Sequence, residues 1–170
     1  MRAEDWDVAI GKWHFEDDGS VWCECRATSS LLYWKHARPK DFEASVEVKF
    51  LGPESSAGIV FRERGEDFYD EATFYQFEWY ARGSHHDKRL SLMRKNPYWI
   101  QIVEPKSPVA PYDTWFRLKV RAEGDHLQSF LDDELVFDTH EKSLVRDGRV
   151  GLHVFQPKKA YFRGFVITAL

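Results

Sequence analysis

The sequence predicts an all-β protein, built as a two-sheet antiparallel jelly-roll sandwich. Short runs rich in Val, Ile, Phe, Tyr and Trp alternate with Gly, Pro, Asp and Ser along the whole length, which is typical of sandwiches and barrels. No segment has the 3.6-residue apolar period of a convincing helix. About thirteen short strands joined by tight turns are too many for one small barrel, so we expect them to divide into two packed layers.

Each expected strand is bounded by turn residues. In 42–51 and 114–122, apolar residues alternate with charged and polar ones, as in strands with one core face and one solvated face. Asp17-Asp18-Gly19 and Glu123-Gly124-Asp125 supply the residues that tight hairpin turns need. The expected strands cover 8–15, 20–26, 30–34, 42–51, 58–62, 73–80, 89–95, 98–104, 114–122, 125–132, 135–139, 149–155 and 160–170.

Length and composition limit the class of protein. A chain of 170 residues with 43% hydrophobic and 16% aromatic residues predicts one folded domain, 1–170, with a core of its own. The net charge of −4 and the pI near 6.0 give no electrostatic reason to expect nucleic acid or a membrane surface as partner. No apolar run reaches the roughly 18 residues of a membrane span.

The first thirteen residues, MRAEDWDVAIGKW, contain no apolar segment of the kind that a secretory signal needs. We therefore expect a cytoplasmic protein, unless the chain is an excised domain of a secreted one. Cys23 and Cys25 lie two residues apart on an expected strand, about 6.6 Å from each other and poorly oriented for a disulfide, so we expect free thiols. The sequence leaves the oligomeric state open.

The stretch 55–94 is the expected binding face, because it concentrates aromatic rings, carboxylates and guanidinium groups. In 73–80 the odd positions are aromatic, whereas the even positions mix rings with hydrogen-bonding groups on the other face. A sugar ring offers paired hydroxyls and an apolar C–H face, so it needs Arg donors, Glu and Gln acceptors and a flat ring. These residue types predict a saccharide ligand for Arg62, Gln76, Glu78 and Tyr80, with Trp79 or Trp99 as the stacking ring. Alternatively, Arg62 and Glu78 only pair across adjacent strands, which stabilises the sheet by roughly 0.2 to 1 kcal/mol.

An enzymatic role is the first alternative to binding. Glycosidic hydrolysis uses two carboxyl groups about 5 to 9 Å apart. Glu78 is a weak candidate for one, and Glu63, Asp67 or Asp70 for the other, but the spacing selects none of them and is also that of a solvated acidic loop. A protein-interaction module is the second alternative, which predicts a large flat apolar patch in place of a groove.

No metal and no cofactor are expected. The acidic run 66–71 offers oxygen ligands for calcium, but its spacing is not that of a defined calcium loop, so calcium is only a lesser alternative. Neighbouring histidines in 85–87 diverge on an extended backbone, which favours an exposed loop over a zinc site.

Several segments resemble, in order along nearly the whole chain, the concanavalin A-like (LamG-like) jelly-roll superfamily. They are Trp6, Gly11, Trp13, Asp18-Gly19, DFEASVEVKF at 41–50, SAGIVFR at 56–62, FYQFEWY at 74–80, YDTWFRLKVRAEGDHLQSFLDDELVFD at 112–138 and GRVGLHVFQPKKAYFRGFVI at 148–167. Within the superfamily, the chain is most similar to 3-keto-disaccharide hydrolase domains and levan-binding-type carbohydrate-binding modules, and it also resembles small galectin-like proteins. Such framework motifs specify a fold more strongly than an activity.

The resemblance implies a concave, lectin-like sheet that receives a saccharide. Arg62, Gln76 and Glu78 would be among the groups lining it, and His153 and Gln156 would lie on or beside it. The implied function is carbohydrate binding, or an accessory role in saccharide metabolism. A glycoside hydrolase acting on a small sugar derivative is the alternative, although the chain matches no complete catalytic set.

Overall fold

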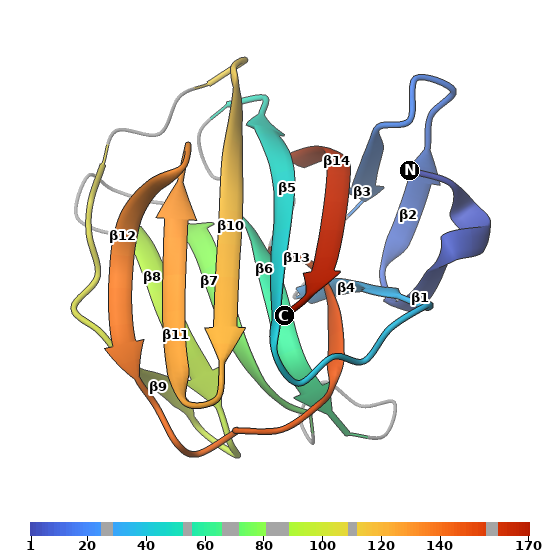
Figure 1. The fold of residues 1–170 in the computed structure, drawn as a ribbon. Helices are drawn as coiled ribbons and strands as arrows, with labels where there is room; N and C mark the ends of the chain where they lie inside the picture. The colour runs from blue at the N-terminus through green and yellow to red at the C-terminus, as the bar shows by residue number, and fades with distance from the viewer. Residues whose placement is uncertain (25–28, 53–55, 66–71, 81–88, 109–111, 156–159) are drawn as a thin grey trace.

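A computed structural model describes residues 1–24, 29–52, 56–65, 72–80, 89–108, 112–155 and 160–170. It confirms the predicted fold: two antiparallel sheets of seven strands pack face to face as a sandwich (Figure 1). Within the described ranges, the one helical element is the short 3₁₀ helix η1, Ala3–Asp5. No helix among the described residues is long and apolar enough to cross a membrane.

Each sheet contains strands from distant parts of the chain. In spatial order, the first sheet contains β1 (Trp6–Ile10), β4 (Ser29–Trp34), β13 (Arg149–Phe155), β6 (Ser56–Arg64), β7 (Thr73–Tyr80), β8 (Arg89–Lys95) and β9 (Trp99–Gln101). In the same way, the second sheet contains β12 (Glu134–His140), β11 (His126–Leu131), β10 (Trp115–Glu123), β5 (Phe42–Phe50), β14 (Ala160–Ala169), β3 (Val21–Glu24) and β2 (Lys12–Phe15). The late strand β13 thus lies between β4 and β6.

The observed strands follow the predicted ones closely, with one instructive difference. The predicted strands 73–80, 89–95 and 149–155 coincide with β7, β8 and β13. The predicted strand 8–15 is instead two strands, because Gly11 has a φ of +93° and turns the chain from the first sheet into the second. A side chain at Gly11 would also place its Cβ 2.3 Å from the Ser30 Oγ.

The core lies between the sheets and follows the alternation of the strands. Along β5, every second residue from Phe42 to Phe50 is buried. From the first sheet, the odd residues Tyr75, Phe77 and Trp79 of β7 point into the same core. Cys23 also packs there as a buried cysteine outside any disulfide.

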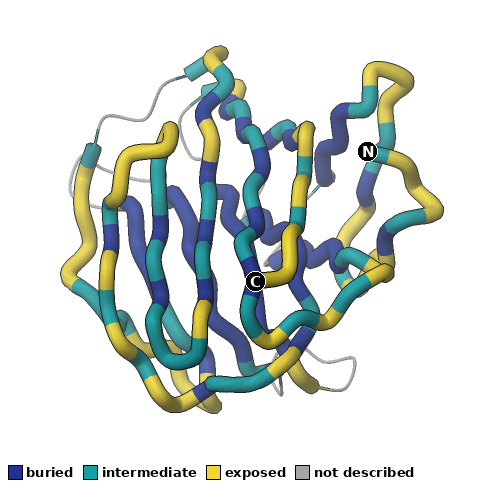
Figure 2. The backbone as a smooth tube through the Cα atoms, viewed as in Figure 1, coloured by how far each residue is buried: buried dark blue, intermediate teal, exposed yellow. Residues whose placement is uncertain are grey.

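The central strands of the first sheet are buried on their outer face as well. All of the central residues of β7 are buried, the even-numbered ones included, and Figure 2 shows β6, β7 and β13 as mostly buried strands. Part of this face is a second apolar cluster, to which Tyr33, Val60 and Phe74 belong. The rest of the face is polar, and that part holds the candidate site.

Candidate functional site

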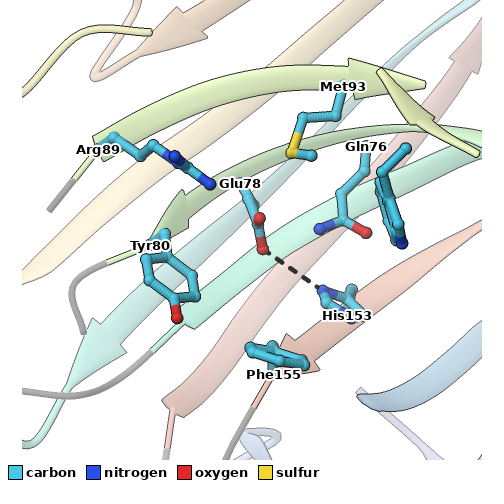
Figure 3. Close-up of a pocket in the computed structure, with 8 residues that line it drawn as sticks. Gln76, Glu78, Tyr80, Arg89, Met93, His153 and Phe155 are labelled. Carbon is cyan, nitrogen blue, oxygen red and sulfur yellow. Dashed lines mark ion pairs between the residues drawn. The ribbon is translucent and has the colours of Figure 1, made fainter. Parts of the chain in front are cut away.

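A hollow of about 220 Å³ lies on the outer face of the first sheet. We call it the outer-face pocket; β7, β8, β9 and β13 supply its lining (Figure 3). The lining residues are Gln76, Glu78, Tyr80, Arg89, Met93, Trp99, His153 and Phe155.

A glycine lets the two sides of the pocket meet. His153 of β13 is opposite Gly58 of β6, and Gly58 is opposite Glu78 of β7, so the three residues form one row across the sheet. Because Gly58 has no side chain, Glu78 and His153 approach each other above it, with 3.6 Å between Glu78 Oε2 and His153 Nδ1. A Cβ at position 58 would lie 2.4 Å from the Phe77 carbonyl oxygen and 2.7 Å from the Glu78 Cβ.

The base of the pocket is polar and almost inaccessible to solvent. Glu78 is 6% exposed and His153 is 1% exposed. Ser56 Oγ donates a hydrogen bond of 2.9 Å to Glu78 Oε2, and His153 Nε2 lies 3.2 Å from Ser29 Oγ, within hydrogen-bond distance. A carboxylate and an imidazole held in this way can accept hydrogen bonds from a ligand and can exchange a proton with it.

Gln76 contributes a buried acceptor to the same base. The residue is 2% exposed, and among the described residues its Oε1 atom has no hydrogen-bond partner. Leaving a buried acceptor unsatisfied costs about 1 to 3 kcal/mol, so such an atom calls for a donor from a ligand or an ordered water.

Aromatic rings form the walls around the polar base. Trp99 remains 38% exposed, and its ring meets Phe74 edge to face with 5.5 Å between the ring centroids. On the opposite side, the rings of Tyr80 and Phe155 lie 6.1 Å apart. The guanidinium carbon of Arg89 lies 5.7 Å from the centroid of the Tyr80 ring.

The pocket brings together most of the residues that the sequence singled out. Gln76, Glu78, Tyr80, Trp99 and His153 all line it. Gln156 lies outside the described residues, as do the acidic run 66–71 and the segment 85–87.

Sequence reasoning missed Arg89, Met93 and Phe155 as lining residues. The pairing of β7 with β8 places Arg89 opposite Tyr80 and Met93 opposite Gln76, so they share the face of the even residues of β7. Along β8, the alternation puts Arg89 and Met93 on the face opposite its leucines. Combined with the register between β7 and β8, this alternation is the signal that could have identified both as site residues.

Arg62 was predicted as a sugar-binding residue, and the structure places it elsewhere. Its side chain is fully buried and does not line the pocket. The guanidinium donates hydrogen bonds to the carbonyl oxygens of Lys40, at 3.0 and 3.2 Å, and of Leu144, at 3.5 Å. Its ionic neighbour is Asp41 at 3.6 Å, and so the alternative of a cross-strand pair between Arg62 and Glu78 is also wrong.

A β-bulge explains the error at Arg62. Strict alternation would put Arg62 on the outer face with Gly58, but the pairing of β6 with β7 shifts register between Phe61 and Arg64. At the bulge, Arg62 has a φ of +53°, in the left-handed region. The side chain consequently turns toward the Lys40 and Leu144 carbonyls, and burial lowers its pKa.

A pair of catalytic carboxylates is not found in the described part of the pocket. Glu78 is the one carboxylate among the described lining residues. Glu63, one of the proposed partners, is buried and bound to Arg149, whereas Asp67 and Asp70 lie outside the described residues.

Solved structures of similar fold include proteins from Bacillus subtilis and Parabacteroides distasonis. The carbohydrate-binding module CBM66 from Bacillus subtilis has a TM-score of 0.79 at 21% identity, covering 97% of this chain and 96% of that chain. A protein of unknown function with a galectin-like fold, also from Bacillus subtilis, has a TM-score of 0.80 at 12% identity, covering 96% and 89%. A putative glycosyl hydrolase from Parabacteroides distasonis has a TM-score of 0.67 at 15% identity, covering 98% and 89%. At these identities the similarity establishes the fold.

Sequence comparison identifies the family. A search of curated proteins found no significant match. The sequence profile of the 3-keto-alpha-glucoside-1,2-lyase-like domain matches residues 2–168, nearly the whole chain. The chain therefore belongs to the 3-keto-alpha-glucoside-1,2-lyase-like domain family.

Proposed function

We propose that this protein binds a saccharide, as a single sugar ring or a small sugar derivative, in the outer-face pocket. The observation that carries the proposal is that one pocket contains buried hydrogen-bonding groups, from Gln76, Glu78 and His153, together with the exposed ring of Trp99. The volume of about 220 Å³ is below the roughly 300 to 1,000 Å³ of pockets for drug-sized ligands, which favours one ring. The carbohydrate-binding module among the similar structures supports the same proposal.

The chemistry of a sugar matches the two kinds of surface in the pocket. Ring hydroxyls donate to the carbonyl oxygen of Gln76 and the carboxylate of Glu78, which satisfies the buried acceptor. The apolar C–H face of the sugar packs against the ring of Trp99. In this arrangement the protein selects for a ring with hydroxyls on its edge and C–H groups on one face.

Calorimetric titration with a panel of monosaccharides and small oligosaccharides tests the proposal. The Trp99→Ala variant should bind about 10-fold more weakly, because it loses an aromatic contact of about 1.4 kcal/mol. Tyr98→Ala is the matched control: Tyr98 is the neighbouring ring, is 78% exposed and does not line the pocket. If no saccharide binds to the wild-type protein, or if both variants bind equally, the pocket is not a sugar site.

An enzymatic function is the second candidate, and the Glu78–His153 pair favours it. The family is described by a 1,2-lyase activity on 3-keto-alpha-glucosides. Such an elimination breaks the C2–H and C1–O bonds, forms a C1=C2 bond and releases the aglycone as an alcohol. It therefore needs a base to remove the C2 proton that the neighbouring carbonyl acidifies, and a proton for the leaving oxygen. A buried imidazole beside a carboxylate supplies one base, whereas hydrolysis by two carboxyl groups needs a second acid in the pocket.

Glu78→Gln separates binding from catalysis. If Glu78 acts in proton transfer, the variant should lose turnover of a 3-keto-glucoside and retain its binding, measured by product formation and by calorimetry. If Glu78 only binds the sugar, affinity should fall by about 10- to 100-fold, the loss expected for a hydrogen bond to a charged group. Glu134→Gln is the control, since Glu134 is an exposed residue of β12. No turnover by the wild-type protein would remove the enzymatic candidate.

A further inference from the structure

Arg89 is the one arginine among the described lining residues of the outer-face pocket. It is the first residue of β8 and is paired with Tyr80 of β7, over whose ring its guanidinium lies. Within the described residues, no carboxylate lies within ion-pair distance of Arg89. Glu78, the one carboxylate among the described lining residues, lies 3.6 Å from His153 and accepts a hydrogen bond from Ser56.

Other arginines of the same sheet are paired with acids. Arginines on β6, β8 and β13 each have a carboxylate oxygen within 4.0 Å. These pairs are Arg62 with Asp41, Arg64 with Asp147, Arg94 with Glu141, and Arg149 with Glu63. Arg89 therefore differs from its neighbours in presenting a guanidinium fork to the pocket with no acid among the described residues to receive it.

We propose that the outer-face pocket selects an acidic sugar, in which a carboxylate on the ring is received by Arg89. This inference rests on the proposed function and specifies the ligand class. The planar guanidinium matches a carboxylate with two parallel hydrogen bonds, and the Tyr80 ring holds it in place by a cation–π contact. The ligand carboxylate lies on the side of the guanidinium away from Glu78, because the two negative charges repel each other. The ring hydroxyls then face Glu78 and Gln76.

Titrations with glucuronate, galacturonate and their uncharged amides test this assignment. A uronate and its uronamide have nearly the same shape and differ in charge, so their affinity ratio measures the contribution of the anion. The wild-type protein should prefer one uronate over its amide by about 10- to 100-fold, the effect expected of a hydrogen bond to a charged group. Arg89→Gln should reduce the ratio to about 1, because the affinity for the uronate falls much more than the affinity for the amide. Arg121→Gln is the control, because Arg121 lies on the second sheet and pairs with Glu123.

The outcomes distinguish this inference from the proposed function. If the amides and the neutral hexoses bind as tightly as the uronates, Arg89 recognises a neutral diol, and the acidic-sugar assignment is wrong while the sugar pocket stands. If glucose 6-phosphate binds and no uronate does, the anion is a phosphate and the carboxylate assignment is again wrong. If none of these sugars binds, the proposed function itself fails. Arg89 is exposed, so its replacement leaves the core intact.

Discussion

Replacing Arg62 by Met should destabilise the protein and leave saccharide binding unchanged. The side chain of Arg62 is fully buried, and its guanidinium donates to the carbonyl oxygens of Lys40 and Leu144. Met keeps much of the side-chain volume and has a Cβ of its own, so the cost of the left-handed backbone is the same in both proteins. The change in stability therefore reports the loss of the guanidinium contacts.

The magnitude follows from the number of acceptors that lose their donor. Two carbonyls each lose a hydrogen bond from a charged group, worth about 1.5 to 3 kcal/mol apiece, and part of this is regained because no charge is buried in the variant. We expect a net loss of about 3 kcal/mol in the free energy of unfolding. An unfolding entropy of about 2.1 cal/mol/K per residue gives ~0.36 kcal/mol/K for this chain, so the melting temperature should fall by about 8 °C.

Calorimetric melting and saccharide titration of the same samples test this reasoning. Arg64→Met is the matched control, because Arg64 lies two residues away and pairs with Asp147 at the surface. Its melting temperature should change by no more than about 3 °C, because an exposed ion pair contributes at most about 1 kcal/mol. An Arg62→Met protein that melts at the wild-type temperature but binds sugar 10-fold more weakly would refute the structural role and restore Arg62 to the binding site.

Two further predictions concern Gly58, which lies between Glu78 and His153, and the carboxylate of Glu141. Gly58→Ala should lower the melting temperature by about 3 to 8 °C and weaken sugar binding. The new Cβ would lie 2.4 Å from the Phe77 carbonyl oxygen, and overpacking of this kind costs about 1 to 3 kcal/mol. An unchanged melting temperature and an unchanged affinity, both measured by calorimetry, would contradict this prediction. Burial raises the pKa of Glu141, but hydrogen bonds from Ser143 and Tyr75 outweigh it, and so the folded pKa lies below the ordinary value of 4.5. The stability that this carboxylate contributes is present above 4.5 and is lost as the pH falls through the folded pKa. Between about pH 5 and pH 3, the free energy of unfolding measured in urea should therefore fall less for Glu141→Gln than for the wild-type protein. Equal losses in the two proteins would contradict the stabilising role of the Glu141 carboxylate.

Local sequence patterns predicted the fold and one strand of the site. The alternation in 73–80 separated the core residues of β7 from Gln76 and Glu78, because a strand sends successive side chains to opposite faces. The same rule failed at Arg62, since a bulge adds one residue to β6 and reverses the alternation there. A bulge depends on how neighbouring strands pair, and that information is not contained in the strand itself.

The remaining parts of the site depend on contacts between distant segments. Arg89 joins the pocket through the register of β7 with β8, and Phe155 joins it through the position of β13 in the sheet. The approach of Glu78 to His153 requires Gly58 between them, which only the order of β13, β6 and β7 brings about. The family resemblance had pointed to His153, and the alternation in 149–155 agrees with it, because Val150, Leu152 and Val154 face the core and His153 faces the other way.

The position of β13 between β4 and β6 also bears on how the molecule assembles. A nascent chain that has been synthesised as far as β8 already carries Glu78, but it lacks the strand that supplies His153. Until β13 emerges and inserts, β4 and β6 each have an edge with unpaired backbone groups, of the kind that invites pairing with other chains. The second-last strand of the chain thus closes the first sheet and brings His153 and Phe155 to the pocket.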